Sequence, residues 1–117
     1  MVATLGEGLT PFVLERIRSA YRDGSMIRTY DLDNDMSRDS LYEADVANFF
    51  AEVSEIYKIE KAHSPKKWHK DNTHFYMRGK SIGGRDVFCK VSSTYHPATG
   101  QFVCWTLTSF CEWKDNY

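Results

Sequence analysis

The sequence has no long hydrophobic run, little proline and almost no net charge. No apolar stretch approaches the roughly 20 residues that a membrane-spanning helix needs. The first ten residues, MVATLGEGLT, lack the basic start and apolar centre of a signal peptide. Only 3 of the 117 residues are proline and 15% are aromatic, which argues against a disordered chain. These features predict a folded, cytoplasmic protein without a membrane partner.

The sequence also lacks the motifs of common metal and nucleotide sites. Its 3 cysteines include no CxxC pair, and its 4 histidines form no HExxH motif. The stretch RGKSIGGRD resembles a phosphate-binding loop only superficially, because His74 stands where that motif requires its first glycine. We therefore expect no metal and no cofactor, and we interpret the cysteines as reduced core residues.

The net charge of −1 conceals a strong segregation of charge along the chain. Residues 1–57 carry 5 basic and 11 acidic side chains, a net −6, whereas residues 58–90 carry 9 basic and 3 acidic ones, a net +6. If the fold keeps these parts on different faces, the basic part attracts polyanions. The acidic part would repel them or bind a basic partner.

The length of 117 residues predicts a single domain, 1–117. Thr10 and Pro11 predict the start of a helix that ends near Gly24. Apolar spacing predicts more helix over residues 40–57, with Asp45 as an internal cap that splits it in two. The acidic stretch DNDMSRDS between these segments indicates a loop.

From Thr73 onward, β-branched and aromatic residues between turn signals predict three strands, over residues 73–82, 85–95 and 101–113. The short connections make an antiparallel meander. In the third strand, alternation places Val103, Trp105 and Leu107 on the buried face. The expected fold is α+β, with N-terminal helices packed on one face of an antiparallel sheet of at least three strands.

The segment from Ile56 to Ser81 interleaves basic and aromatic residues. Lysine and arginine contact phosphates and aromatic rings stack on bases, a mixture that suits single-stranded nucleic acid. The alternative, in which the lysines only solvate a loop and the aromatic residues belong to the core, stays open. The candidate phosphate-binding residues are Lys70, Arg78, Lys80 and Arg85, and the candidate stacking residues are Trp68 and Tyr76.

Such a segment has the chemistry to cut RNA without a metal. The 2′-hydroxyl of RNA can attack the adjacent phosphorus, so the protein must move protons and stabilise the charge that develops on phosphate. Histidine is the side chain best suited to proton transfer near neutral pH, which makes His69 a candidate catalytic residue. Lys58 is the second candidate, together with the neighbouring cations.

Five short motifs follow one another along the chain: Ile56-Tyr57-Lys58, Trp68-His69, Phe75–Arg78, Val87–Lys90 and Ser109–Glu112. Their order resembles that of the MqsR-type ribonuclease toxins of bacterial toxin–antitoxin systems, in the wider RelE-like group of small α+β ribonucleases. The resemblance covers about residues 55–112. It implies a metal-independent endoribonuclease that acts on messenger RNA and is held inactive by an antitoxin.

In this resemblance Lys58 matches a functional lysine, and His69 stands where the family has glutamine. Phe88 replaces the family's functional tyrosine, and Cys111 replaces its C-terminal lysine. These two replacements favour an alternative, a non-catalytic interaction protein such as an inhibitor or adaptor from a mobile element, docking through the acidic helices or the basic segment. A small-molecule-binding α+β domain is a further alternative.

Overall fold

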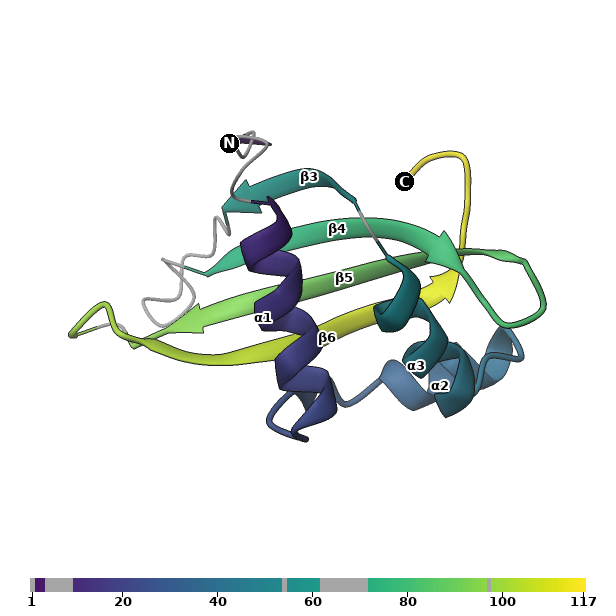
Figure 1. The fold of residues 1–117 in the computed structure, drawn as a ribbon, viewed down its shortest axis with the longest axis horizontal. Helices are drawn as coiled ribbons and strands as arrows, with labels where there is room; N and C mark the ends of the chain where they lie inside the picture. The colour runs from purple at the N-terminus through teal and green to yellow at the C-terminus, as the bar shows by residue number, and fades with distance from the viewer. Residues whose placement is uncertain (1, 4–9, 54, 62–71, 97) are drawn as a thin grey trace.

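The fold is seen in a computed structural model that describes residues 2–3, 10–53, 55–61, 72–96 and 98–117. Three helices and one sheet make an α+β arrangement (Figure 1). No helix in these described ranges is long and apolar enough to cross a membrane. In chain order the elements are β1 (Val2–Ala3), α1 (Thr10–Arg22), β2 (Ile27–Arg28), α2 (Leu32–Arg38), α3 (Glu43–Glu52), β3 (Ile56–Lys61), β4 (Thr73–Lys80), β5 (Asp86–Tyr95) and β6 (Phe102–Glu112).

The strands follow the order β1-β3-β4-β5-β6-β2 across the sheet. The three predicted strands correspond to β4, β5 and β6, which pair antiparallel as expected. The prediction of a purely antiparallel sheet is wrong, because β2 pairs parallel with β6. The helices also form no uninterrupted N-terminal block, because β1 precedes α1 and β2 separates α1 from α2.

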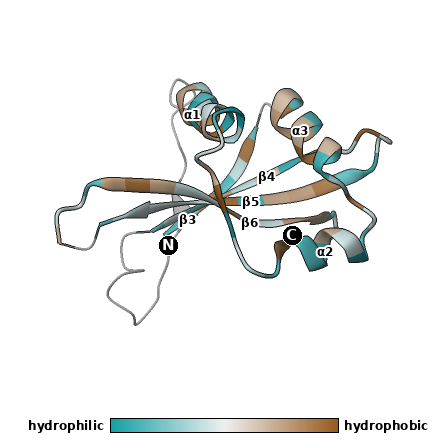
Figure 2. Cartoon of the chain, turned by 90° about the horizontal axis from the view of Figure 1, so that it is seen from below, coloured by the Kyte–Doolittle hydropathy of each residue, from teal (hydrophilic) through white to brown (hydrophobic). Residues whose placement is uncertain are grey.

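Helices α1 and α3 cover one face of the sheet, and α2 lies beside the β6 edge (Figures 1 and 2). Between helices and sheet lies one hydrophobic core, in which Ile17, Val46, Phe49, Met77 and Phe110 are completely buried. Burial of this apolar surface is the main favourable contribution to folding. The opposite face of the sheet is called the outer face below.

The end of α3 corrects the prediction of helix up to residue 57. The helix stops at Glu52, and β3 begins at Ile56. Arg18 on α1 donates hydrogen bonds to the main-chain oxygens of Phe50, at 2.7 Å, and Val53. Carbonyls at a helix C-terminus have no partner inside the helix, so the guanidinium stabilises this end.

Two further predictions about the helices are wrong. The stretch expected to be a loop contains α2, whose Leu32 and Met36 are one turn apart and pack in the core. Asp45 does not split a helix, because its carboxylate accepts the main-chain N–H of Tyr42 at 2.9 Å and so caps the start of α3. The sequence of α2 did not indicate a helix, because it contains several aspartates, which favour loops, and only two apolar residues at helical spacing.

The meander contains an irregularity that shifts the faces of β6. The register with β5 changes between Lys90 and Val91, so that Trp105 and Leu107 face the core and Phe110 continues this face. A bulge adds one residue to a strand and changes which side chains point inward. Val103 was expected on the buried face, but it is 56% exposed because the beginning of β6 extends beyond the core.

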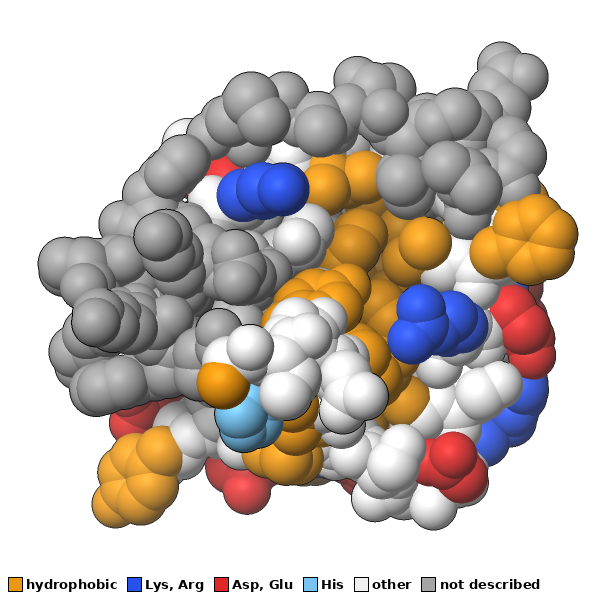
Figure 3. Space-filling model, turned by 90° about the vertical axis from the view of Figure 1, so that its left-hand side faces the viewer, with side chains coloured by type: hydrophobic (Ala, Val, Ile, Leu, Met, Phe, Trp, Pro, Cys, Tyr) orange, Lys and Arg blue, Asp and Glu red, His pale blue; other side chains and the backbone are white. Residues whose placement is uncertain are grey.

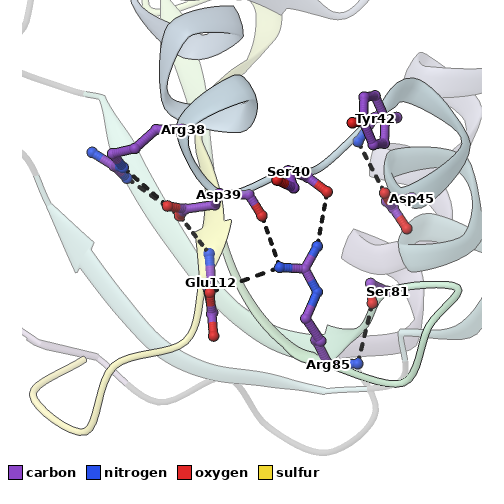
Figure 4. Close-up of polar contacts among 8 residues, drawn as sticks. All are labelled: Arg38, Asp39, Ser40, Tyr42, Asp45, Ser81, Arg85 and Glu112. Atoms are coloured by element: carbon purple, nitrogen blue, oxygen red, sulfur yellow. Dashed lines mark hydrogen bonds and ion pairs between the residues drawn. The ribbon is translucent and has the colours of Figure 1, made fainter.

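The turn between β4 and β5 is tied to the loop between α2 and α3 (Figure 4). Arg85 donates hydrogen bonds to the main-chain oxygens of Asp39, at 2.7 Å, and Ser40, at 2.8 Å. Asp45 on α3 makes a second link to the same turn, because its Oδ1 accepts the main-chain N–H of Ile82 at 3.0 Å. These bonds fix the ends of two strands relative to the helices.

Candidate nucleic-acid interface

Strand β4 carries the predicted binding residues on the outer face. Phe75 and Met77 are buried in the core, so the alternating residues Tyr76, Arg78 and Lys80 point the other way. Strand alternation thus brings three of the predicted residues onto one surface. Their neighbours on β3 and β5 determine what this surface can bind.

A bulge in β3 places two consecutive side chains near this surface. The pairing with β4 shifts between Ile56 and Lys58, and Ile56 packs against the core. The ring of Tyr57 lies 6.3 Å from that of Tyr76, and the ammonium of Lys58 lies 4.8 Å from the centre of the Tyr76 ring. The irregularity therefore turns both an aromatic ring and a cation toward the same neighbour.

Tyr76 lies at the centre of the outer face. Its hydroxyl donates a hydrogen bond to Glu60 at 2.9 Å, and the Lys90 ammonium lies 5.7 Å from its ring centre. Burial, together with the carboxylate of Glu60, raises the pKa of Tyr76 to about 12. The same hydrogen bond lowers the pKa of Glu60. At neutral pH the pair is therefore a neutral phenol bonded to an ionised carboxylate.

Lys58 remains accessible within this arrangement. Its ammonium lies 3.6 Å from Glu60, and its side chain is 39% exposed. A pair of exposed charges at this separation contributes little to stability, so an incoming phosphate can compete with Glu60 for the lysine. Lys58 on β3 and Lys90 on β5 belong to the two strands that flank β4, so both place positive charge next to the Tyr76 ring.

Arg78 extends the positive surface along β4. Its guanidinium lies 4.2 Å from the centre of the Trp113 ring and donates a hydrogen bond to Asp86 at 3.1 Å. Lys80 binds the other oxygen of Asp86 at 2.7 Å. These two hydrogen bonds lower the pKa of Asp86, that of Lys80 having the larger effect. The carboxylate therefore neutralises part of the charge that the two cations bring.

The residues after β6 turn back toward β4 and β3, as the yellow C-terminal segment of Figure 1 shows, and their rings contact side chains of the outer face. The main-chain N–H of Trp113 bonds to the Asp86 oxygen at 2.9 Å. The Tyr117 ring stacks on Phe88 with the ring centres 4.1 Å apart. Trp113 contacts Tyr57 with the ring centres 5.6 Å apart. The segment thus adds two aromatic rings to the surface.

The two residues that depart from the ribonuclease-toxin pattern are neighbours in the sheet. Phe88 and Cys111 are paired in the register of β5 and β6. Tyr117 contacts both, because its ring stacks on Phe88 and its hydroxyl lies 3.4 Å from the Cys111 sulfur. That contact and burial raise the pKa of Tyr117 to about 12. A neutral phenol therefore lies beside both replaced positions.

The remaining predicted residues do not join this surface in the described structure. Arg85 is engaged with the α2–α3 loop and lies 3.7 Å from Glu112, so its guanidinium has structural partners (Figure 4). Trp68, His69 and Lys70 lie outside the described residues. The predicted group is therefore represented by Lys58, Tyr76, Arg78 and Lys80, of which the first three lie close to the aromatic rings.

Sequence reasoning missed Trp113 and Tyr117 on the outer face, whereas Tyr57 and Lys90 are among the aromatic and basic residues that suggest RNA contacts. Lys90 follows from the alternation of β5, in which it is the partner of Tyr76. The positions of Trp113 and Tyr117 depend on the backward turn after β6, which has no periodic signal. His74 also faces outward, and its Nδ1 is hydrogen-bonded to Ser92.

Metal ligands are not gathered in this part of the chain. Within the described residues, no three His, Cys, Asp or Glu side chains are grouped so that they could hold a metal ion.

No protein-family model matches the chain, and no curated protein or solved structure matches it either. The function must therefore be argued from the outer face itself.

Proposed function

We propose that this protein binds single-stranded RNA on the outer face of its sheet and cleaves it without a metal ion. The observation that supports this proposal is the arrangement of cations around aromatic rings. Lys58 and Lys90 lie within 6 Å of the Tyr76 ring centre, at 4.8 and 5.7 Å, and Arg78 lies 4.2 Å from the Trp113 ring centre. Stacked bases and charged phosphates need this combination.

The accessibility of these groups fits an extended strand. Lys58 and Arg78 are 39% and 49% exposed, and each has only one acidic partner within ion-pair distance among the described residues. RNA phosphates would add to or replace these partners. Since each contact would release counterions from the RNA, binding should weaken as the salt concentration rises.

Cleavage would proceed through the 2′-hydroxyl of the RNA. Its oxygen bonds to phosphorus as the bond to the 5′-oxygen breaks, which gives a 2′,3′-cyclic phosphate and a 5′-hydroxyl. One group must take the 2′-proton and another must protonate the leaving oxygen. We assign removal of the 2′-proton to His69, protonation of the leaving 5′-oxygen to a water molecule, and stabilisation of the phosphate charge to Lys58, with Arg78 holding the phosphate.

The test is incubation of purified protein with a single-stranded RNA and its 2′-deoxy counterpart in EDTA. We expect cyclic-phosphate product from RNA alone, and a large loss of rate in His69→Ala and Lys58→Gln. Arg22→Gln, on the exposed side of α1, is the control and should cut at the wild-type rate. An inactive wild type, or an unaffected His69→Ala, would remove the proposed mechanism.

The interaction-protein alternative is favoured by a different observation. A groove of about 430 Å³ lies between α1 and β6 and is lined by Phe12, Arg16, Phe102 and Trp105 among others. Phe12 is 70% exposed, and Figure 3 shows hydrophobic side chains gathered at this end of the molecule. Exposed apolar patches often mark protein-binding surfaces.

Co-purification distinguishes this alternative from RNA binding. A protein partner that is retained by the wild type and lost in Phe12→Glu, without salt-sensitive RNA binding by the wild type, would decide for an interaction module. Salt-sensitive RNA binding that Phe12→Glu leaves unchanged would decide for the outer face.

A further inference from the structure

A pocket of about 350 Å³ opens at one end of the outer face, between β3, β4 and the C-terminal segment. Its lining contains three aromatic rings and two charged side chains: Glu55, Tyr57, Arg78, Trp113 and Tyr117. Ligand pockets are typically apolar cavities of this size with a few polar groups that fix orientation. This one lies beside the cations that we assign to RNA phosphates.

The aromatic walls of the pocket form a connected set. The ring centres of Tyr57 and Trp113 are 5.6 Å apart, and those of Trp113 and Tyr117 are 5.7 Å apart. Both pairs meet edge to face, at 71° and 80°. Walls at steep angles to one another leave ring faces available to a flat ligand, which a nucleobase can contact by stacking.

The two charged side chains of the pocket, Arg78 and Glu55, can form further hydrogen bonds. Arg78 uses one of its nitrogens on Asp86, and its guanidinium carbon lies over the Trp113 ring. Within the described part of the chain, Glu55 has no ion pair, not even with Arg78, although both line the pocket. A guanidinium has five N–H donors and a carboxylate only acceptors, so a ligand must offer both an acceptor and a donor.

Tyr57 provides an independent indication of a polar ligand. Its hydroxyl is buried and has no hydrogen-bond partner among the described residues. Burial also raises the pKa of this phenol. Buried polar atoms are nearly always hydrogen-bonded, so an unpaired one at the wall of a pocket calls for a partner other than the described residues.

We infer that this pocket takes one nucleobase of the bound RNA, and that Glu55 selects bases with an exocyclic amino group. The inference rests on the proposed RNA function. The aromatic walls accommodate a flat ring. A ring nitrogen or carbonyl of the base accepts an N–H of Arg78 that is not used by Asp86 or by the phosphate, and the amino group donates to Glu55. Uracil and hypoxanthine lack the amino group of cytosine and guanine and leave the carboxylate without that bond.

The experiment uses two pairs of nucleotides that differ in this amino group, CMP with UMP and GMP with IMP. The full-length protein is titrated with each, and binding is followed by the NMR signal of the Trp113 indole N–H, assigned with Trp113→Phe. We expect CMP and GMP to bind about tenfold more tightly than their partners, as a hydrogen bond to a charged group requires. Glu55→Gln should remove most of this preference.

Glu52→Gln is the matched control, because Glu52 is an exposed glutamate on α3, away from the pocket. Equal affinity within each pair in the wild type, or an unchanged preference in Glu55→Gln, would overturn the role of Glu55. RNA binding without any nucleotide effect on Trp113 would overturn the pocket but leave the RNA function standing. Nucleotide binding here without RNA binding would support the pocket and remove the proposed function.

Discussion

Replacement of Gly79 by alanine tests the close packing of α3 on the sheet. A Cβ atom at this position would lie 2.6 Å from Cε2 and 2.8 Å from Cδ2 of Phe49. The Phe49 ring is completely buried, and its centre lies 5.5 Å from those of both Phe50 and Phe110. Because these rings enclose it, Phe49 has little room to move aside.

The expected cost follows from two opposing effects. Overpacking of a well-packed core costs about 1–3 kcal/mol. Alanine loses less chain entropy on folding than glycine and recovers about 0.5–1 kcal/mol. We therefore expect Gly79→Ala to lower the free energy of unfolding by about 1–2 kcal/mol, which lowers the melting temperature by several degrees at this chain length.

Urea unfolding measures the change. The matched control is Gly83→Ala, whose new Cβ would have Ser81 Oγ at 3.9 Å as its nearest neighbour and should be almost neutral. Adding Phe49→Leu to Gly79→Ala should cost less than the sum of the single changes, because the smaller side chain relieves the clash. Equal stability of Gly79→Ala and Gly83→Ala would refute the packing described here.

Three further predictions concern other parts of the structure. Arg85→Gln should lower the free energy of unfolding by about 1–3 kcal/mol in urea, because two loop carbonyls lose a charged donor; an unchanged midpoint would contradict this. The pKa of Glu60 is lowered chiefly by the Tyr76 hydroxyl, so its folded pKa lies below the unfolded one and ionised Glu60 adds stability that is lost on acidification. Wild type should therefore lose more stability than Tyr76→Phe between about pH 5 and pH 3 in thermal melts, and parallel losses would contradict it. Burial raises the pKa of the Cys89 thiol, so a thiol reagent followed by peptide mass spectrometry should label the half-buried Cys104 first, and earlier labelling of Cys89 would contradict its burial.

The parts of the fold that were predictable have strong local signals. Thr10, Pro11 and Gly24 bracket α1, and β-branched and aromatic residues between turns indicate β4, β5 and β6. Strand β3 was missed because Phe49, Val53 and Ile56 continue a helical spacing beyond the end of α3. That end depends on Arg18, a tertiary contact that no local pattern contains.

The outer face was predictable to a similar degree. Alternation in β4 places Tyr76 and Arg78 on one side, and the choice of basic and aromatic residues singled them out. The β3 bulge that turns Tyr57 and Lys58 toward Tyr76 depends on how two distant strands pair. The return of Trp113 over Arg78 likewise depends on contacts made only in the folded chain.

The parallel pairing of β2 with β6 has a consequence for the order of folding. The contact between Thr29 and Thr108 joins residues 79 positions apart, whereas β4, β5 and β6 are joined by short connections. Closing a long loop costs more chain entropy, so the meander should form early and β2 should dock late. The same two-residue edge strand should open first in the native protein, and its amide protons should exchange with solvent well before those of β5.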